Sequence, residues 1–370
     1  MKFVCQKANL LKEITLALDF TSQRNSLSIV SNVLLENYGD KLIIKATDQK
    51  VGFYSEIEVQ TIEPGSTTVF CDKFLGVLRS LPEGDVQFEE KDTKLIIRPV
   101  GQTIDFQLRT IEADKFPQLQ SIDDSKYFSI SQSDYIEMIN QTIFAISEDE
   151  TRYFMNGVFF EHATDSLTMV ATDGRRLSII QRKFMEKITQ FPSVIIPAKF
   201  LNLIKKMGTG EGMFDLAVTD SMVFARFDNH CIYSTLINGQ FPNYKRVIPD
   251  SQTFSCRVSI QEMLDALKRV SLFVENKSKR LILDIEPTGI MLSSEESDLG
   301  AAKEIIPCEY DGDSCKLSLN YTYLYSPLRV MEGEHFFLQF SGPTKAMTVK
   351  PDPERDYFHI IMPMQPQSNS

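Results

Sequence analysis

Residues Val158–Glu161 (Val-Phe-Phe-Glu) and Ala171–Asp173 (Ala-Thr-Asp) decide the fold, because the chain carries both patterns twice. The segments Val33–Glu36 (Val-Leu-Leu-Glu) and Ala46–Asp48 (Ala-Thr-Asp) stand 125 residues before them, at 33 against 158 and 46 against 171. Two further pairs hold the same spacing, Phe3 with Phe128 and Phe116-Pro117 with Phe241-Pro242. Four matches in one register indicate a chain built from repeated units.

A third copy of the unit begins near Phe254 and keeps the order of elements with a more divergent sequence. Polar stretches at Gln120–Lys126 and Asp250–Gln252 separate the copies, as expected of domain boundaries. The length of 370 residues also exceeds what one ordinary core requires. We therefore predict three domains, at residues 1–122, 127–250 and 253–370.

Each copy contains two helical patterns. The first helices are predicted to begin at capping residues near Asn9, Ser133 and Ser259. The second show apolar residues at helical spacing, in 74–81, 200–207 and 323–330, and Pro327 predicts a shortened or kinked third member. Short segments rich in β-branched and aromatic residues lie between the helices: Lys41–Ala46, Leu95–Pro99, Gln102–Leu108 and Leu281–Ile285. Each copy is thus predicted to be an α+β unit, with antiparallel strands and two helices on one face.

Composition excludes several classes of protein. Hydrophobic residues make up 42% and charged residues 24% of the chain, which is typical of a globular protein. No run approaches the length of a membrane span, and the start lacks the apolar region of a secretory signal. The six cysteines are scattered without a CxxC pair, which favours reduced thiols in the cytoplasm. We expect no membrane association, metal or cofactor.

Catalytic motifs are missing from the sequence. The four histidines stand far apart, and no GxSxG, Walker, GxGxxG or HExxH motif occurs. We therefore expect a protein that is not an enzyme, although folding can still bring a pair of carboxylates together. A second alternative is a repeat-built scaffold that binds peptides without encircling DNA.

Several motifs together resemble those of bacterial DNA sliding clamps, the beta subunits of DNA polymerase III. They are Ser22–Asn25 with Ser31–Glu36, Asn156–Glu161 with Val170–Leu177, Gly239–Pro249, and the ending Met362–Met364. The resemblance extends from Met1 to Gln365. It implies three clamp domains, with sheets outside and helices inside, in a head-to-tail homodimeric ring. The ring would encircle duplex DNA without sequence preference and confer processivity. The implied partners are the clamp loader, the catalytic subunit of the replicative polymerase and other clamp-binding replication or repair proteins.

The implied ring can be checked against helix dimensions. Twelve helices spaced about 10 Å apart give a circle of axes roughly 38 Å across. Subtracting about one helix diameter leaves roughly 28 Å, which accommodates a duplex about 20 Å wide. Six helices from a single chain would leave only about 9 Å by the same reasoning. Two chains per ring therefore suit DNA.

Net charge alone argues against DNA binding, because the chain carries 39 basic and 50 acidic residues for a net charge of −11. Basic residues nevertheless concentrate on the second helices, which predicts a mildly basic lining suited to weak, mobile contact. The lysines and arginine of those helices, together with the resemblance, give the predicted DNA-binding residues. They are Arg24, Lys73, Arg79, Asp149, Tyr153, Phe154, Lys199, Lys205 and Lys206. Asp72 and Asp149 place acidic charge on this surface.

The resemblance also implies a cleft for partner peptides between the second and third domains. Its residues would be Met155, Thr172, Gly174, Arg175, Arg176, Leu177, Pro242, Arg246, Val247, Ile360 and Met362. Arg175 departs from the histidine common at its position, and Gln365 replaces the usual basic residue ahead of the extension Pro366–Ser370. For the dimer contact, the resemblance implies that Phe106 and Leu108 meet Leu272 and Phe273 of the other chain.

Overall fold

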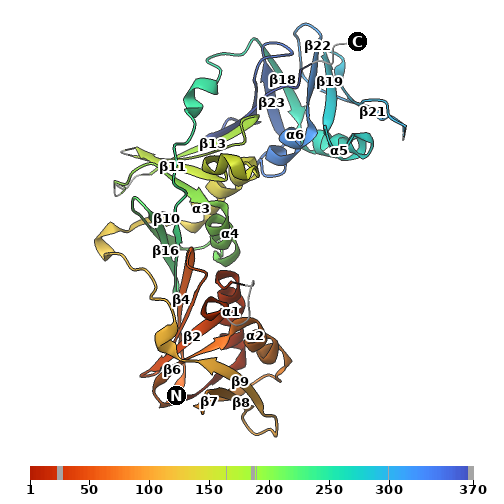
Figure 1. Cartoon of the computed structure of the whole chain (residues 1–370). Coiled ribbons are helices and arrows are strands. Elements are labelled where there is room, and N and C mark those ends of the chain that lie inside the picture. The colour runs from red at the N-terminus through yellow and green to blue at the C-terminus, as the bar shows by residue number, and fades with distance from the viewer. Residues whose placement is uncertain (23–27, 164, 185–187, 189, 299, 366–370) are drawn as a thin grey trace. The chain divides into compact units, whose positions relative to one another are not determined.

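The computed structural model describes residues 1–22, 28–163, 165–184, 188, 190–298 and 300–365 (Figure 1). The chain divides into two compact units, one of residues 1–133 with 199–236 and one of residues 134–198 with 237–370. The central sequence copy therefore contributes to both units. No helix in the described ranges is long and apolar enough to cross a membrane.

The first unit is a sheet of thirteen antiparallel strands with helices on one face, in the order β10-β15-β16-β17-β4-β3-β2-β6-β9-β8-β7-β1-β5. Its helices are α1 (Lys7–Ala17), α2 (Cys71–Ser80) and α4 (Ala198–Met207). Its strands are β1 (Lys2–Gln6), β2 (Asn32–Tyr38), β3 (Lys41–Thr47), β4 (Val51–Glu58), β5 (Gln60–Glu63), β6 (Gly65–Phe70), β7 (Asp85–Lys91), β8 (Lys94–Pro99), β9 (Phe106–Ile111), β10 (Phe128–Ser131), β15 (Met213–Val218), β16 (Met222–Phe227) and β17 (His230–Thr235).

The second unit has an eight-stranded sheet, β14-β11-β12-β13-β25-β24-β23-β18, and a four-stranded sheet, β21-β20-β19-β22. Its helices are α3 (Gln132–Asn140), α5 (Ile260–Val270) and α6 (Tyr321–Leu328). Its strands are β11 (Gly157–Ala163), β12 (Ser166–Thr172), β13 (Arg176–Lys183), β14 (Val194–Pro197), β18 (Phe254–Ser259), β19 (Arg280–Glu286), β20 (Gly289–Ser294), β21 (Lys303–Ile306), β22 (Cys315–Asn320), β23 (His335–Phe340), β24 (Met347–Asp352) and β25 (Tyr357–Ile361).

Successive sequence copies are joined by strand pairing. Strand β4 of the first copy pairs with β17 of the central copy, and β13 of the central copy pairs with β25 of the third. At the first of these junctions the buried Glu13 carboxylate accepts a hydrogen bond from Ser55 and lies 2.8 Å from Nε2 of His230. The thirteen-stranded and eight-stranded sheets therefore each run across a copy boundary, which explains why compact units and sequence repeats differ.

The second helices of the first two copies, α2 and α4, are amphipathic as predicted. Phe74 and Leu78 of α2 are buried, as are Phe200 and Ile204 of α4, whereas the basic residues of both helices lie on the outer side. Helix α6 has eight residues against ten in α2 and α4, with Pro327 in its last turn. The predicted shortening at this proline is thus confirmed.

Two of the three predicted capping residues lie inside their helices. Helix α1 begins at Lys7 and α3 at Gln132, close to Asn9 and Ser133, and of the three predicted capping residues only Ser259 caps its helix. The reason is that strands β1 and β10 run directly into their helices. The N–H groups of Lys7 and Gln132 each donate to a loop carbonyl 3.0 Å away. These bonds satisfy an N–H group that has no partner within the helix, as a polar capping residue would do.

Candidate functional site

The recurring Ala-Thr-Asp motif shapes a hairpin turn. Oδ1 of Asp173 accepts hydrogen bonds from the backbone N–H groups of Arg175 and Arg176, at 2.8 and 3.0 Å. The Thr172 hydroxyl donates to the Arg176 carbonyl and accepts from the N–H of Gly174, whose φ of +87° suits glycine. Asp48 binds the N–H groups of residues 50 and 51 in the same way, each at 2.9 Å. The motif therefore recurs because it fixes this turn in two copies.

The second of these turns forms one wall of a cavity of about 250 Å³. Ten of the eleven residues predicted for the peptide cleft line it: Met155, Thr172, Gly174, Arg175, Arg176, Leu177, Pro242, Val247, Ile360 and Met362. Asn243 and Tyr244 complete the lining. The eleventh predicted residue, Arg246, is exposed on the 3-10 turn Tyr244–Val247 and is not among the lining residues.

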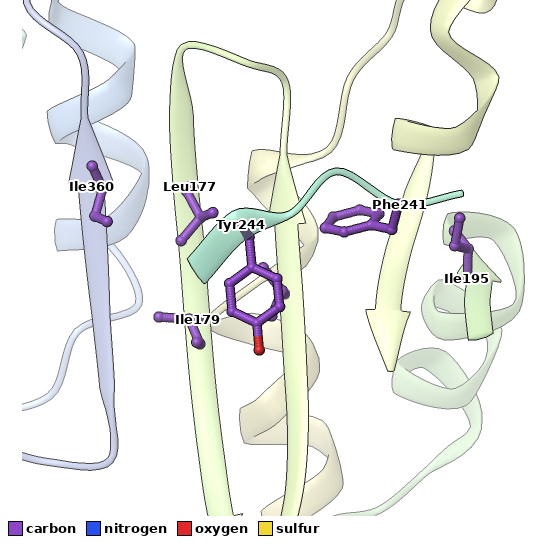
Figure 2. Packing of buried hydrophobic residues seen from close by; sticks show 7 residues of the cluster. Leu177, Ile179, Ile195, Phe241, Tyr244 and Ile360 are labelled. Atoms are coloured by element: carbon purple, nitrogen blue, oxygen red, sulfur yellow. The ribbon is translucent and has the colours of Figure 1, made fainter. Parts of the chain in front are cut away.

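Three of the lining residues, Leu177, Tyr244 and Ile360, belong to the buried hydrophobic cluster shown in Figure 2. Leu177 of β13 lies opposite Ile360 of β25, and both are almost fully buried. The segment that carries Phe241 and Tyr244 crosses β13 and brings both side chains into the cluster, and Phe241 stacks on Phe159 of β11. The rim differs from this buried cluster, since Val247 is 50% and Met362 41% exposed. The cavity is thus an apolar depression with adaptable, accessible edges.

Arg176 is the oriented cation of the cavity wall. Its Nε donates to Oδ2 of Asp173 at 3.0 Å, and its guanidinium lies 4.8 Å from the ring centre of Tyr323 and 5.8 Å from that of Phe144. The side chain is only 15% exposed. These contacts hold the guanidinium in one orientation, so it can meet a carboxylate or carbonyl with little loss of side-chain freedom.

Sequence reasoning missed Asn243, Tyr244 and Tyr323. The first two stand between Pro242 and Val247, so the signal was their place inside a motif already recognised. The Tyr244 hydroxyl donates to Glu161 at 2.5 Å, and burial together with this carboxylate raises the pKa of Tyr244 above its usual value. Tyr323 reaches Arg176 from α6, which the linear sequence does not reveal.

Five of the predicted DNA-binding residues lie on α2 and α4 of the first unit. Lys73, Arg79, Lys199 and Lys206 are exposed. Lys205 is half-buried, and burial lowers its pKa below the usual value. Arg24 lies outside the described residues.

The remaining predicted DNA-binding residues belong to the second unit, around the 3-10 segment Glu150–Met155. Tyr153 is 54% exposed and meets Phe154 edge to face, with ring centres 5.8 Å apart. Asp149 caps this segment, since its carboxylate accepts from Thr151 and from Nε of Arg152. These hydrogen bonds lower the pKa of Asp149, and the contribution of Thr151 is larger than that of Arg152. The geometry gives Asp149 a local structural role that the sequence did not indicate.

The residues predicted for the dimer contact lie beside incompletely paired strand edges. Phe106 and Leu108 are half-buried on β9, which pairs with β8 through residues 106–109 but with β6 only through residues 110 and 111. Leu272 is 80% and Phe273 38% exposed after α5. Helix α5 packs on β21, the last strand of its sheet, where Ile305 is 69% exposed.

One group of carboxylates that the fold brings together serves an ion-pair network. Asp134, Glu137 and Asp356 all bind the guanidinium of Arg182. Burial opposes the charged state of Arg182, but the hydrogen bonds with Glu137 and Asp356 outweigh burial and raise its pKa. Across the described ranges, no cluster of three or more His, Cys, Asp or Glu residues suits a metal ion.

Family models match three successive segments of the chain. Residues 1–120, 129–243 and 245–365 match the N-terminal, central and C-terminal domains of the DNA polymerase III beta subunit, respectively. The beta sliding clamp of Treponema pallidum is 42% identical over 369 residues, with 99% of this chain and 100% of the relative covered. That of Caulobacter vibrioides is 29% identical over 373 residues, covering 99% and 100% of the two chains.

Solved structures agree with these matches. The DNA polymerase sliding clamp of Bacillus subtilis superposes with a TM-score of 0.94 at 25% identity, covering 99% of both chains. The Pseudomonas aeruginosa clamp bound to griselimycin gives 0.93 at 26% identity, covering 99% of this chain and all of that one. The three α+β copies predicted from the repeat and the clamp fold implied by the resemblance are therefore confirmed, and this chain belongs to the DNA polymerase III beta subunit family, the beta sliding clamps.

Proposed function

We propose that two copies of this chain close head to tail into a cytoplasmic ring that slides on duplex DNA and tethers the replicative polymerase. The observation that carries this proposal is the cavity at β13 and β25, which unites ten predicted cleft residues from distant parts of a full-length clamp fold. The family comprises processivity factors rather than catalysts, so the chain acts by binding.

Exposed apolar side chains and open strand edges support the dimer. Leu272 and Ile305 are largely exposed in the second unit, and the first half of β9 has an edge without a strand partner in the described residues of the first unit. Such edges and side chains tend to be covered by a partner. Pairing β9 of one chain with β21 of the other, twice per ring, satisfies both and unites six of the proposed domains, at residues 1–122, 127–250 and 253–370 of each chain.

The dimensions and chemistry of the cavity support a peptide ligand. Its volume of about 250 Å³ is below the roughly 300–1,000 Å³ of typical small-molecule sites. One or two apolar side chains of a short peptide fit such a space, while Arg176 pairs with a carboxylate or carbonyl. Each buried side chain contributes about 1.5–3 kcal/mol, consistent with exchangeable partners. The proposed partners are the polymerase catalytic subunit, the clamp loader and other clamp-binding replication or repair proteins.

Loading onto circular DNA tests the central proposal. After incubation with its clamp loader and a nicked circle, the protein should remain with the DNA through gel filtration. Cutting the circle once should release it, because only topological linkage needs a closed path. A peptide-binding scaffold that never encircles DNA would show no difference between circle and linear DNA, and that result would reject the ring.

The basic residues of α4 should contribute weak, sequence-independent contacts with DNA. Neutralising Lys199, Lys205 and Lys206 to glutamine should reduce retention on the circle and flatten its salt dependence. The slope of log affinity against log salt should change by at most about 2.7, since each phosphate contact contributes about 0.9. Binding of a short labelled duplex across a salt series measures the slope. An unaltered slope would show that these lysines do not face DNA.

A further inference from the structure

Two of the three α4 lysines are already engaged by acids of the first sequence copy. Nζ of Lys199 lies 2.6 Å from Oδ2 of Asp48, and Nζ of Lys206 lies 2.5 Å from Oδ2 of Asp19. Asp19 belongs to the 3-10 turn Leu18–Phe20 that follows α1. Lys205, between the two lysines, has no ion pair in the described part of the chain.

The Asp48 carboxylate is held in place before it meets the lysine. Its Oδ1 accepts from the N–H groups of Lys50 and Val51, which leaves Oδ2 directed at Lys199. Burial opposes its ionisation, but the hydrogen bonds from Lys199 and the turn outweigh burial and keep the pKa of Asp48 below its usual value. Asp173, its counterpart in the second copy, also uses Oδ1 for the turn and Oδ2 for a cation, Arg176.

The two ion pairs lie where the proposed DNA surface needs free cations. We propose that Asp48 and Asp19 are built-in competitors of the DNA phosphates for Lys199 and Lys206, and that they keep the contact of α4 with DNA weak. This inference rests on the proposed role of α4 in facing DNA. On this inference, Lys199 and Lys206 bind DNA only by exchanging an aspartate carboxylate for a DNA phosphate.

The exchange is physically feasible because both pairs reach solvent. The lysine side chains are 46% and 51% exposed, and the aspartates 19% and 34%. Solvent screening leaves such pairs with little net stability, so a passing phosphate can replace a carboxylate at small cost. Each lysine that binds a phosphate frees an aspartate, which then repels the backbone. The net binding free energy of each lysine–phosphate contact is therefore small. A ring that moves along DNA requires such weak contacts.

A double-mutant cycle on DNA binding tests the competition. The variants are Asp48→Asn with Asp19→Asn, Lys199→Gln with Lys206→Gln, and all four together. The substitution Asp48→Asn keeps a side-chain oxygen that can accept from the turn N–H groups, so the hairpin should be retained. Removing the aspartates should tighten binding of a short labelled duplex about 3–10-fold at low salt and steepen its salt slope by up to about 1.8, two contacts at about 0.9 each.

The effect of the lysine substitutions is compared with and without the aspartates. A difference between the two backgrounds distinguishes competition for the lysines from a general change in net charge. Removing the two lysines should alter the slope by less than about 0.5 in the wild-type background, but by about 1.8 when the aspartates are already neutral. Asp72→Asn, at an exposed acid in the first turn of α2, is the control and should show no coupling to the lysines.

Equal effects of the lysine substitutions in both backgrounds would overturn the competition while leaving α4 as a DNA surface. If neutralising all three α4 lysines has no effect in either background, the DNA surface itself is misassigned, and the inference fails with it. Sedimentation of every variant as a dimer confirms that an altered slope comes from the surface and not from a lost ring.

Discussion

A chain carrying Leu272→Asp and Phe273→Asp is expected to sediment as a monomer at concentrations where the unaltered chain is a dimer. Leu272 is 80% exposed in the single chain, so the substitution should leave the monomer fold largely intact. Losing the burial of two large apolar side chains weakens each interface by about 3–6 kcal/mol, at roughly 1.5–3 kcal/mol per side chain. A ring with two such interfaces should therefore open completely, and retention on circular DNA should be lost with it.

Tyr38→Asp with Ile62→Asp is a matched control for the dimer variant. These side chains are 57% and 49% exposed, and neither belongs to the proposed contact. The control should remain dimeric, with thermal unfolding close to that of the unaltered chain. A dimer that survives the Leu272 and Phe273 substitutions would place the interface elsewhere on the molecule.

Deleting residues 362–370 is expected to abolish stimulation of the polymerase while leaving the ring. Met362 forms part of the cavity wall, and its N–H donates to the Arg175 carbonyl at 2.8 Å. The deletion removes this wall, whereas strands β13 and β25 stay paired through residues 176–180 and 357–361. Processive synthesis on a primed circle measures stimulation, and sedimentation with circle retention reports on the ring.

Two further variants sharpen this experiment. Deleting only residues 366–370 leaves every cavity-lining residue in place and should preserve stimulation. Val247→Ala with Met362→Ala trims two exposed rim residues without shortening the chain, and should reduce stimulation in proportion to peptide affinity. If the long deletion still stimulates the polymerase normally, the cleft is wrongly assigned even where the ring is intact.

The amphipathic second helices and the repeat were readable from the sequence because both are periodic. Phe74 and Leu78 occur at helical spacing and are buried on one side of α2, and Phe200 and Ile204 repeat this in α4. Helix starts were less readable. Lys7 and Gln132 donate their N–H groups to loops distant in sequence, and a local sequence pattern does not indicate such partners.

Most cleft residues could be named in advance because the motif around Thr172–Leu177 resembles that of a known family. The physical account of that motif came only from the fold, in which Asp173 fixes the turn with one oxygen and holds Arg176 with the other. Tyr323 shares this arginine from a helix almost 150 positions later, at 323 against 176. A local sequence pattern cannot predict a contact between residues so far apart in the chain.

The sequence by itself determined the α+β copies and the basic character of α2 and α4, since both depend on residue type and spacing along the chain. Only the tertiary structure decided which charges are available. Lys199 and Lys206 have no acidic neighbour within their own helix, yet strand pairing of β4 with β17 and the turns after β3 and α1 supply Asp48 and Asp19 as partners. An electrostatic interaction depends on distance in space, and folding sets that distance independently of separation along the chain.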